Sequence, residues 1–423
     1  MRINFPYSVI NSVDVPDKNL LGIFSPSTVP VEKSEGEIIE EGFLHPIGSS
    51  RLPEIVEWCQ DVLILVDDYT RTTPIQKILP RLMKDLERGG IKREGIRFLI
   101  ASGTHRPMTE EEIVKKFGEE ISKQYPILNH RWWDSSQLVY LGETTSGIPI
   151  YINRLVEEVD LIIGVGQIVP HRVSGFSGGG NIVQPGICGE ETTGKTHWLS
   201  AQFDGWEILG RSINPVKKEI EQVAEKSGLE WIINTIQDGT DRLVRVVTGD
   251  PVRAYREGAA QSREVYQSQL PEEADIVIAD SYPYDSELWV ASKGIYAAEL
   301  AVKKGGVVVL ITPCPEGISV SHPEVLEWGY QTYEEVERKV RKGELKKLTA
   351  AAHLVHVGRV IKERANGILV SPGISKEQTE KLGFTYAKDP QEALEIAFSL
   401  SSRDAKVAVL QRGGEILPVI EKM

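Results

Sequence analysis

Three histidines stand where their side chains could act together. His105 follows the apolar run 96–101, His171 follows the apolar run 160–165, and His197 opens a predicted helix, THWLSAQF. An imidazole with its ordinary pKa near 6.5 exchanges protons near neutral pH, and its neutral form binds metals. Their positions predict that all three converge on one edge of a sheet, where they could do acid–base or metal chemistry.

A glycine run lies directly behind the second of these histidines, in the stretch PHRVSGFSGGGNIVQPG at 170–186. Packing alone requires neither a histidine nor three consecutive glycines at this point. The plainer interpretation is a loop that lets two backbones approach closely, with His171 as a hydrogen-bonded loop residue. The other histidines do not follow strands, and we assign them no role: His45, His130, His322, His353 and His356.

The elements that must position these residues are short runs of Val, Ile and Leu, each followed by a polar loop and then a helical pattern. Continuous apolar runs are typical of strands buried on both faces of a parallel sheet, so the sequence predicts an α/β fold. Ligands bind such sheets beyond the carboxyl ends of the strands. The predicted strands cover 61–68, 96–103, 160–167, 274–281, 305–313 and 367–374.

The length of 423 residues indicates two domains. The polar segment SQLPEE at 268–273 places a first domain at 1–270 and a second at 274–404. Residues 228–247 alternate and predict a hairpin that turns at Asp238-Gly239.

The charge balance favours a small-molecule ligand. The formal net charge is −13 and the only basic clusters are short helical patches such as KKFGEEISK, which argues against nucleic acid or an anionic membrane as a partner. We expect neither a signal peptide nor a membrane span. Three widely spaced cysteines, Cys59, Cys188 and Cys314, fit a reducing compartment, so we expect a cytoplasmic protein.

A phosphate-binding loop is a competing interpretation of the same region. Residues 189–196, GEETTGKT, match the pattern G-x-x-x-x-G-K-[ST], with Lys195 as its lysine. That pattern has physical meaning only when a buried strand leads into the first glycine, and here Pro185-Gly186 interrupt the approach. A phosphohydrolase is therefore the less favoured hypothesis.

The segments around these loops resemble the nickel-pincer lactate racemase family. The similar segments are DDYTR at 67–71, SGTHR at 102–106, the stretch 170–186, KTHW at 195–198 and SKGIYAAE at 292–299. The resemblance implies an isomerase that interconverts stereoisomers of a 2-hydroxy acid by hydride transfer, using a nickel-pincer nucleotide made by dedicated biosynthetic enzymes. It also implies two α/β domains with mostly parallel sheets, the site in the cleft between them, and a tail at 405–423 that returns to the first domain.

The resemblance also implies roles for individual residues. His105 and His171 match the two acid/bases, and His197 matches the protein ligand to nickel. Arg71 and Lys293 match cations that bind a carboxylate. Asp68 and Thr70 fall in the cofactor-binding part, where the backbone of Ser177, Gly178, Gly179 and Gly180 could form a nest for a phosphate.

Two positions depart from the family pattern. Asn181 stands where well-known members carry a lysine that holds the cofactor through a thioamide, so we expect a noncovalently bound cofactor. Trp289 and Val290 stand where lactate racemases have a tyrosine and a glutamine, which favours a larger or more apolar substrate than lactate. A binding protein of the same fold without turnover is the alternative that Asn181 suggests.

Overall fold

Two six-stranded sheets form the framework of the protein in the computed structural model, which describes residues 1–421. The strand order is β13-β12-β9-β4-β5-β6 in the first sheet and β18-β17-β16-β15-β19-β3 in the second. Within these two sheets of the described residues, β12 and β13 form the only antiparallel pair, which is the predicted hairpin. The predicted α/β class with mostly parallel sheets is therefore confirmed.

All six strands predicted from apolar runs are present. In the first sheet the strands are β4 (Val62–Asp67), β5 (Ile96–Ala101), β6 (Ile127–Asn129), β9 (Leu161–Gln167), β12 (Leu229–Gln237) and β13 (Leu243–Gly249). In the second they are β3 (Leu20–Phe24), β15 (Ala274–Asp280), β16 (Val302–Ile311), β17 (Asn366–Val370), β18 (Thr385–Tyr386) and β19 (Val407–Leu410).

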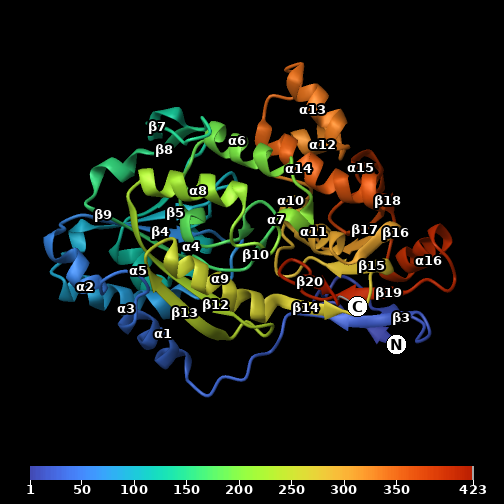
Figure 1. Ribbon diagram of the computed structural model, residues 1–423, viewed down its shortest axis with the longest axis horizontal. Coiled ribbons are helices and arrows are strands. Elements are labelled where there is room, and N and C mark those ends of the chain that lie inside the picture. Colours follow the sequence, from blue (N-terminus) through green and yellow to red (C-terminus); the bar gives the residue numbers. More distant parts are fainter. Residues whose placement is uncertain (422–423) are drawn as a thin grey trace.

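Helices cover both faces of each sheet (Figure 1). On the first sheet, Leu63 and Leu65 of β4 face the core with helices α8 (Pro215–Lys226) and α9 (Arg253–Tyr266). Ile64 and Val66 face the opposite core. That core is shared with α1 (Glu35–Leu44), α2 (Leu52–Ile55) and α3 (Ile75–Arg88). Burial on both faces explains why the strand is continuously apolar.

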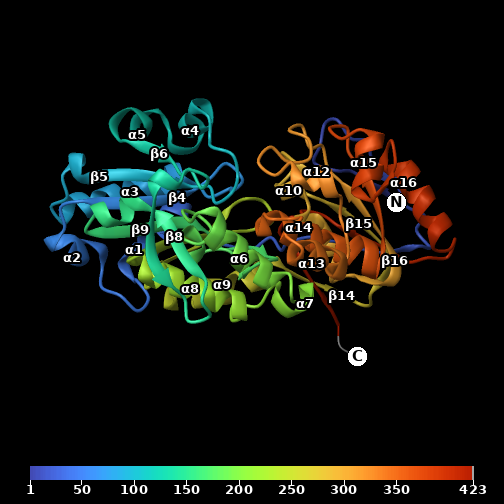
Figure 2. The ribbon, with the colours of Figure 1, turned by 90° about the horizontal axis from the view of Figure 1, so that it is seen from above.

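The second sheet is built in the same way. Helix α16 (Pro390–Leu400) and N-terminal residues pack on one face, and α11 (Lys293–Glu299) and α14 (Leu348–Gly358) pack on the other. The two sheets lie in separate lobes side by side, with α6 (Glu190–Ser200) and α14 where the lobes meet (Figure 2).

The chain is divided between the lobes differently from our expectation of 1–270 and 274–404 with a tail at 405–423. β3 pairs with β19, and β19 pairs with β15, so both ends of the chain add strands to the second sheet. β20 (Leu417–Ile420) pairs with β14 (Gln267–Leu270) at the junction. Neither β3 nor β19 is a long apolar run, and each pairs with a strand distant in the sequence. The sequence pattern alone therefore did not reveal that both ends of the chain join the second sheet.

The segment 189–196 is not a phosphate loop. Gly189 caps α6, and the rest of the segment lies inside that helix, where Lys195 pairs with Glu191 one turn away at 3.4 Å. Backbone amides inside a helix are bound to carbonyls of the preceding turn and cannot surround a phosphate. The phosphohydrolase hypothesis is therefore wrong.

Among the described residues, no helix combines the length and apolar character that crossing a bilayer requires.

Candidate active site

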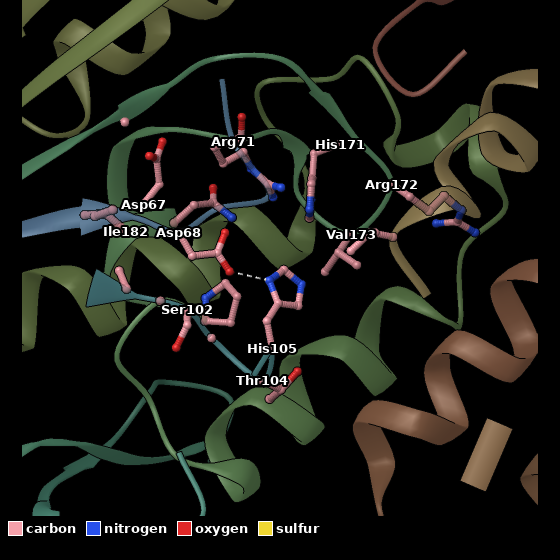
Figure 3. A pocket seen from close by; sticks show the side chains of 18 of the residues that line it. Asp67, Asp68, Arg71, Ser102, Thr104, His105, His171, Arg172, Val173 and Ile182 are labelled. Carbon is pink, nitrogen blue, oxygen red and sulfur yellow. Dashed lines mark hydrogen bonds and ion pairs between the residues drawn. The ribbon is translucent and has the colours of Figure 1, made fainter. Parts of the chain in front are cut away.

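A cavity of about 160 Å³ lies where the carboxyl ends of β4, β5 and β9 face the second lobe. Its walls include most of the residues singled out from the sequence: Asp68, Arg71, His105, His171, Ser177, Gly178, Asn181, His197, Trp289 and Lys293. Figure 3 shows several of them directed toward a common space. The predicted convergence of His105, His171 and His197 is confirmed by this geometry.

His105 is held by an aspartate (Figure 3). Its Nδ1 atom lies 2.6 Å from Oδ2 of Asp68, which also accepts a hydrogen bond from the Thr70 hydroxyl through its other oxygen. Burial would raise the pKa of Asp68, but the charge and hydrogen bond of His105 outweigh it and the pKa lies well below its usual range. An ionised carboxylate only accepts, so Nδ1 carries a hydrogen, and Nε2 is the nitrogen left to exchange a proton.

His171 has a neutral partner instead. It ends the short strand β10 (Pro170–His171), and its Nδ1 atom lies 3.0 Å from Oγ of Ser174. Because the Ser174 hydroxyl donates to the carbonyl of Phe176, Nδ1 of His171 must donate to Ser174, which leaves Nε2 as a base. Burial, together with the nearby Lys293 and other cations, lowers the pKa of His171 well below 6.5, so its imidazole is neutral.

His197 presents a free nitrogen suited to a metal. On α6, its Nδ1 atom donates to the carbonyl of Thr193 at 2.9 Å, so Nε2 is unprotonated. Burial lowers the pKa of His197 to about 4, which keeps the imidazole neutral. Among residues 1–421, no group of three or more His, Cys, Asp or Glu side chains is arranged to hold a metal ion. A metal at His197 would thus have at most two such protein ligands in the described residues and would need a cofactor for the others, which fits a pincer that brings its own donors.

Two cations share an aromatic neighbour at the cavity wall. Nζ of Lys293 lies 3.4 Å from the ring centroid of Tyr284, and the guanidinium of Arg71 lies 5.4 Å from the same centroid. Burial and the charge of Arg71 lower the pKa of Lys293 well below its usual value. Within the described residues its Nζ has no hydrogen-bond partner, so an anion that enters the cavity could accept hydrogen bonds from it.

Asn181 does not offer a covalent attachment point, because a side-chain amide has no nucleophilic amine, and both ends of its amide are engaged in hydrogen bonds. Its Oδ1 atom accepts a hydrogen bond of 2.5 Å from Lys217, and its Nδ2 atom donates to Ser174 at 3.1 Å. Lys217 is a buried residue of α8 that the sequence reasoning missed. The signal was its place on the apolar face of that helix, three residues before Ile220 and seven before Ala224.

The glycine run serves packing more than phosphate binding, which corrects part of our expectation. Gly179 donates its amide to Asn234 Oδ1 at 2.9 Å and has a positive φ of 56°. A Cβ atom there would lie 2.9 Å from Tyr255, and one on Gly180 would lie 2.9 Å from Ala224. Neither Gly179 nor Gly180 lines the cavity, whereas Ser177 and Gly178 do. Thr70 also lies outside the lining, since its hydroxyl is used by Asp68.

A stack of rings forms the apolar wall in the second lobe. Trp289, in α10 (Leu288–Ala291), lies between His322 and His353, with centroid distances of 4.0 and 4.1 Å. Val290 follows it in the wall. His353 and His356 also line the cavity, although we had assigned them no role. Their spacing of three residues in one helix, which places both on one face, was the available signal.

The fold and this site together define a two-lobed α/β enzyme with two imidazole bases, a third imidazole suited to a metal, and two cations in one cavity. Models of the lactate racemase N-terminal domain and C-terminal domain match residues 8–205 and 270–417. The chain belongs to the lactate racemase family, and it is an isomerase of the racemase class.

Individual relatives agree over nearly the whole length. Lactate racemase of Thermoanaerobacterium thermosaccharolyticum is 28% identical over 431 residues, covering 98% of this chain and 99% of that protein. Lactate racemase of Lactiplantibacillus plantarum is 29% identical over 432 residues, covering 98% of each. The structure of the T. thermosaccharolyticum lactate racemase apoprotein superposes with a TM-score of 0.88 at 27% identity, covering 100% of both chains. A protein from Thermotoga maritima gives a TM-score of 0.75 at 25% identity, covering 93% of this chain and 100% of that one.

Proposed function

We propose that this protein racemises or epimerises a 2-hydroxy acid more apolar than lactate, with a nickel-pincer nucleotide bound noncovalently. The observation that carries the proposal is a pair of histidines, His105 and His171, that line one cavity and whose Nδ1 atoms are both held by hydrogen bonds, which leaves Nε2 of each to exchange a proton. Inverting a hydroxyl-bearing carbon requires one group that takes the hydroxyl proton from the first stereoisomer and another that returns a proton as the second stereoisomer forms. Two histidines can exchange these roles, so the reaction can run in either direction.

The cations supply substrate binding. Arg71 can hold a carboxylate through two parallel N–H groups. Lys293 adds a buried amine that has no hydrogen-bond partner in residues 1–421, and a bound carboxylate would favour its charged form. A carboxylate fixed in this way keeps the adjacent hydroxyl within reach of one of the two histidines. His105 and His171 then act in turn, one taking the hydroxyl proton and the other returning a proton when the opposite isomer forms.

His197 would hold the nickel of the cofactor through Nε2, and Asp68, Ser177 and Gly178 are the further residues at the cavity that could contact it. When bound, the nickel cofactor supplies an acceptor for the hydride on the α-carbon, which avoids removing a very weakly acidic proton. Because the amide of Asn181 is engaged by Lys217 and Ser174, retention rests on noncovalent contacts.

The choice of substrate follows from the wall around Trp289. Trp289 and Val290 offer apolar surface with no hydroxyl or amide acceptor at this wall, and stacking on two imidazoles fixes the indole. An apolar substituent on the α-carbon therefore gains more from this wall than a polar one does.

The test uses protein co-produced with the enzymes that make the cofactor. Nickel content and native and denaturing masses are measured first, and then single enantiomers of lactate, 2-hydroxybutyrate and 3-phenyllactate are incubated and separated by chiral chromatography. We expect stoichiometric nickel, a mass increment lost on denaturation, and inversion that is fastest for the apolar acids. Absence of nickel and of inversion would favour the binding protein that Asn181 suggests.

Variants of the three histidines test the roles separately. His105→Ala and His171→Ala should each abolish inversion and keep the nickel, whereas His197→Ala should lose the nickel. Activity retained in both of the first two variants would overturn the acid/base assignment.

A further inference from the structure

A lysine outside the cavity lining holds the loop that carries Asp68 and Arg71. Lys116 lies near the end of α4 (Glu110–Phe117), and its side chain is only 8% exposed. Its Nζ atom donates to the backbone carbonyls of Asp68 at 2.6 Å and Arg71 at 3.2 Å, and it forms an ion pair of 2.8 Å with Oδ1 of Asp67.

The two carbonyls accept two of the three hydrogens of the ammonium group, and the Asp67 carboxylate pairs with its charge. The two carbonyls stand at opposite ends of the turn, which is also closed by the amide of Arg71 donating to the carbonyl of Asp68 at 3.2 Å. The other carboxylate oxygen of Asp67 accepts a hydrogen bond from Thr73. The ammonium therefore fixes both ends of the loop relative to the end of β4.

The orientation of the loop decides where its side chains point. With the carbonyls of Asp68 and Arg71 turned toward Lys116, the Asp68 carboxylate reaches His105 and Arg71 lies at the cavity wall (Figure 3). The same helix acts on the second loop, because Glu112 forms a two-pronged ion pair with Arg106, the residue next to His105.

We infer that Lys116 is a positioning residue that sets the Asp68–His105 pair and Arg71 in their working geometry. Its role in turnover rests on the proposed function, whereas its effect on the Asp68–His105 pair does not. Lys116 belongs to the segment KKFGEEISK, whose pattern is typical of a short basic patch on the surface of a helix. Its neighbour Lys115 is exposed and provides a matched control.

The first experiment needs no cofactor. The protein is labelled with ¹⁵N-histidine, His105 is assigned with His105→Gln, and the Nδ1 and Nε2 shifts report which nitrogen carries the hydrogen. We expect Nδ1–H in the wild type and in Lys115→Met, and a mixture of the two forms in Lys116→Met. An unchanged His105 in folded Lys116→Met would overturn the inference, whatever the activity of the protein.

The second experiment measures inversion of 3-phenyllactate by the cofactor-loaded protein. A displacement of the pair by about 1 Å costs on the order of 10²-fold in rate, so Lys116→Met should lower kcat by about that factor and raise KM through Arg71. Lys115→Met should match the wild type, and Lys116→Arg should recover part of kcat because it restores a cation with several donors. If Lys116→Met does not fold, the same shifts and rates are read from Lys116→Arg and Lys116→Gln, and values identical to wild type in both would overturn the inference. Inactive wild-type protein with the expected shift in His105 would instead overturn the proposed function alone.

Discussion

The side-chain oxygen of Asn181 lies 2.5 Å from Nζ of Lys217, a buried lysine that reaches it from α8. The same ammonium donates to the carbonyl of Gly178 at 2.9 Å and lies 3.5 Å from the ring centroid of Tyr255. A lysine amine from another part of the chain therefore already fills the space beside position 181, and burial lowers its pKa well below the usual value.

Asn181→Lys should destabilise the protein for this reason. The new ammonium would approach Lys217 in a buried site, and the lost amide would leave Ser174 without one of its donors. We expect the free energy of unfolding in urea to fall by about 2–4 kcal/mol. The double variant Asn181→Lys/Lys217→Met removes the contact between two buried lysine amines and should recover at least half of the loss. Equal stability of the single variant and wild type would contradict the argument.

Asp68→Asn should impair turnover more than stability. The amide is nearly the same size as the carboxylate, but its Nδ2 can donate to Nδ1 of His105 and so place the hydrogen on Nε2, where the base is needed. We expect kcat/KM for inversion to fall by about 10²- to 10⁴-fold. Initial rates measure the effect, and the melting temperature serves as the control. Wild-type rates in this variant would show that the aspartate does not set the form of the imidazole.

Trp289→Tyr combined with Val290→Gln should shift the preference toward lactate. These substitutions return a hydroxyl and an amide to the wall and remove apolar surface that a larger substituent would contact. A change of about 1–3 kcal/mol in the relative transition-state binding corresponds to about a 10- to 100-fold change in the ratio of kcat/KM for lactate and 3-phenyllactate. Competition between the two acids in one reaction measures this ratio directly. An unchanged ratio would exclude this wall as the determinant of specificity.

Asp280→Asn should make the protein more stable, and more so at alkaline pH. Asp280 ends β15 and is buried, which raises its pKa to about 7 from 3.8, although backbone amides of Gly413 and Tyr282 donate to Oδ1. A raised pKa means that the folded state binds the proton more tightly than the unfolded state, so the stability of the wild type falls as pH rises toward 7. The advantage of the variant should therefore grow by about 2 kcal/mol between about pH 5.5 and about pH 8.5.

Urea denaturation at several pH values checks this, and Asp275→Asn is a contrasting variant. Asp275 lies on the same strand, but its pKa is lowered rather than raised: burial opposes the shift, while the Lys406 amide and the side chain of Lys303 outweigh it. The advantage seen in Asp280→Asn should be absent there. A constant difference between Asp280→Asn and wild type across the pH range would show that the carboxyl group does not titrate on unfolding.

Much of the framework could be predicted because burial on both faces leaves a local trace. The runs that became β4, β5, β9, β15, β16 and β17 are continuously apolar, and parallel strands put the loops that follow them at one edge. This argument correctly predicted that His105 and His171 lie in one site. His197 was expected at the same edge from its place at the start of a predicted helix; the structure puts it in the last turn of α6 instead, but in the same cavity.

The partners of these residues came only from the tertiary structure. Lys116, Lys217 and Ser174 act through hydrogen bonds that depend on the direction of a side chain or a carbonyl, and residue types in a sequence do not specify direction. His353 and His356 belong to the second lobe, so their approach to the cavity depends on how α14 packs against α6. The placement of β3 and β19 depends likewise on pairing between the two ends of the chain.

The sequence by itself determined the α/β class, the strands with their polar exits, and the identity of the groups able to exchange protons, because hydrophobic periodicity and side-chain chemistry are local properties. The tertiary structure decided which nitrogen of each histidine is held by a hydrogen bond, why Asn181 is held in place, and that Gly179 and Gly180 serve packing. Those properties depend on contacts between residues far apart in the chain, whose geometry is fixed only when both lobes are folded and packed together.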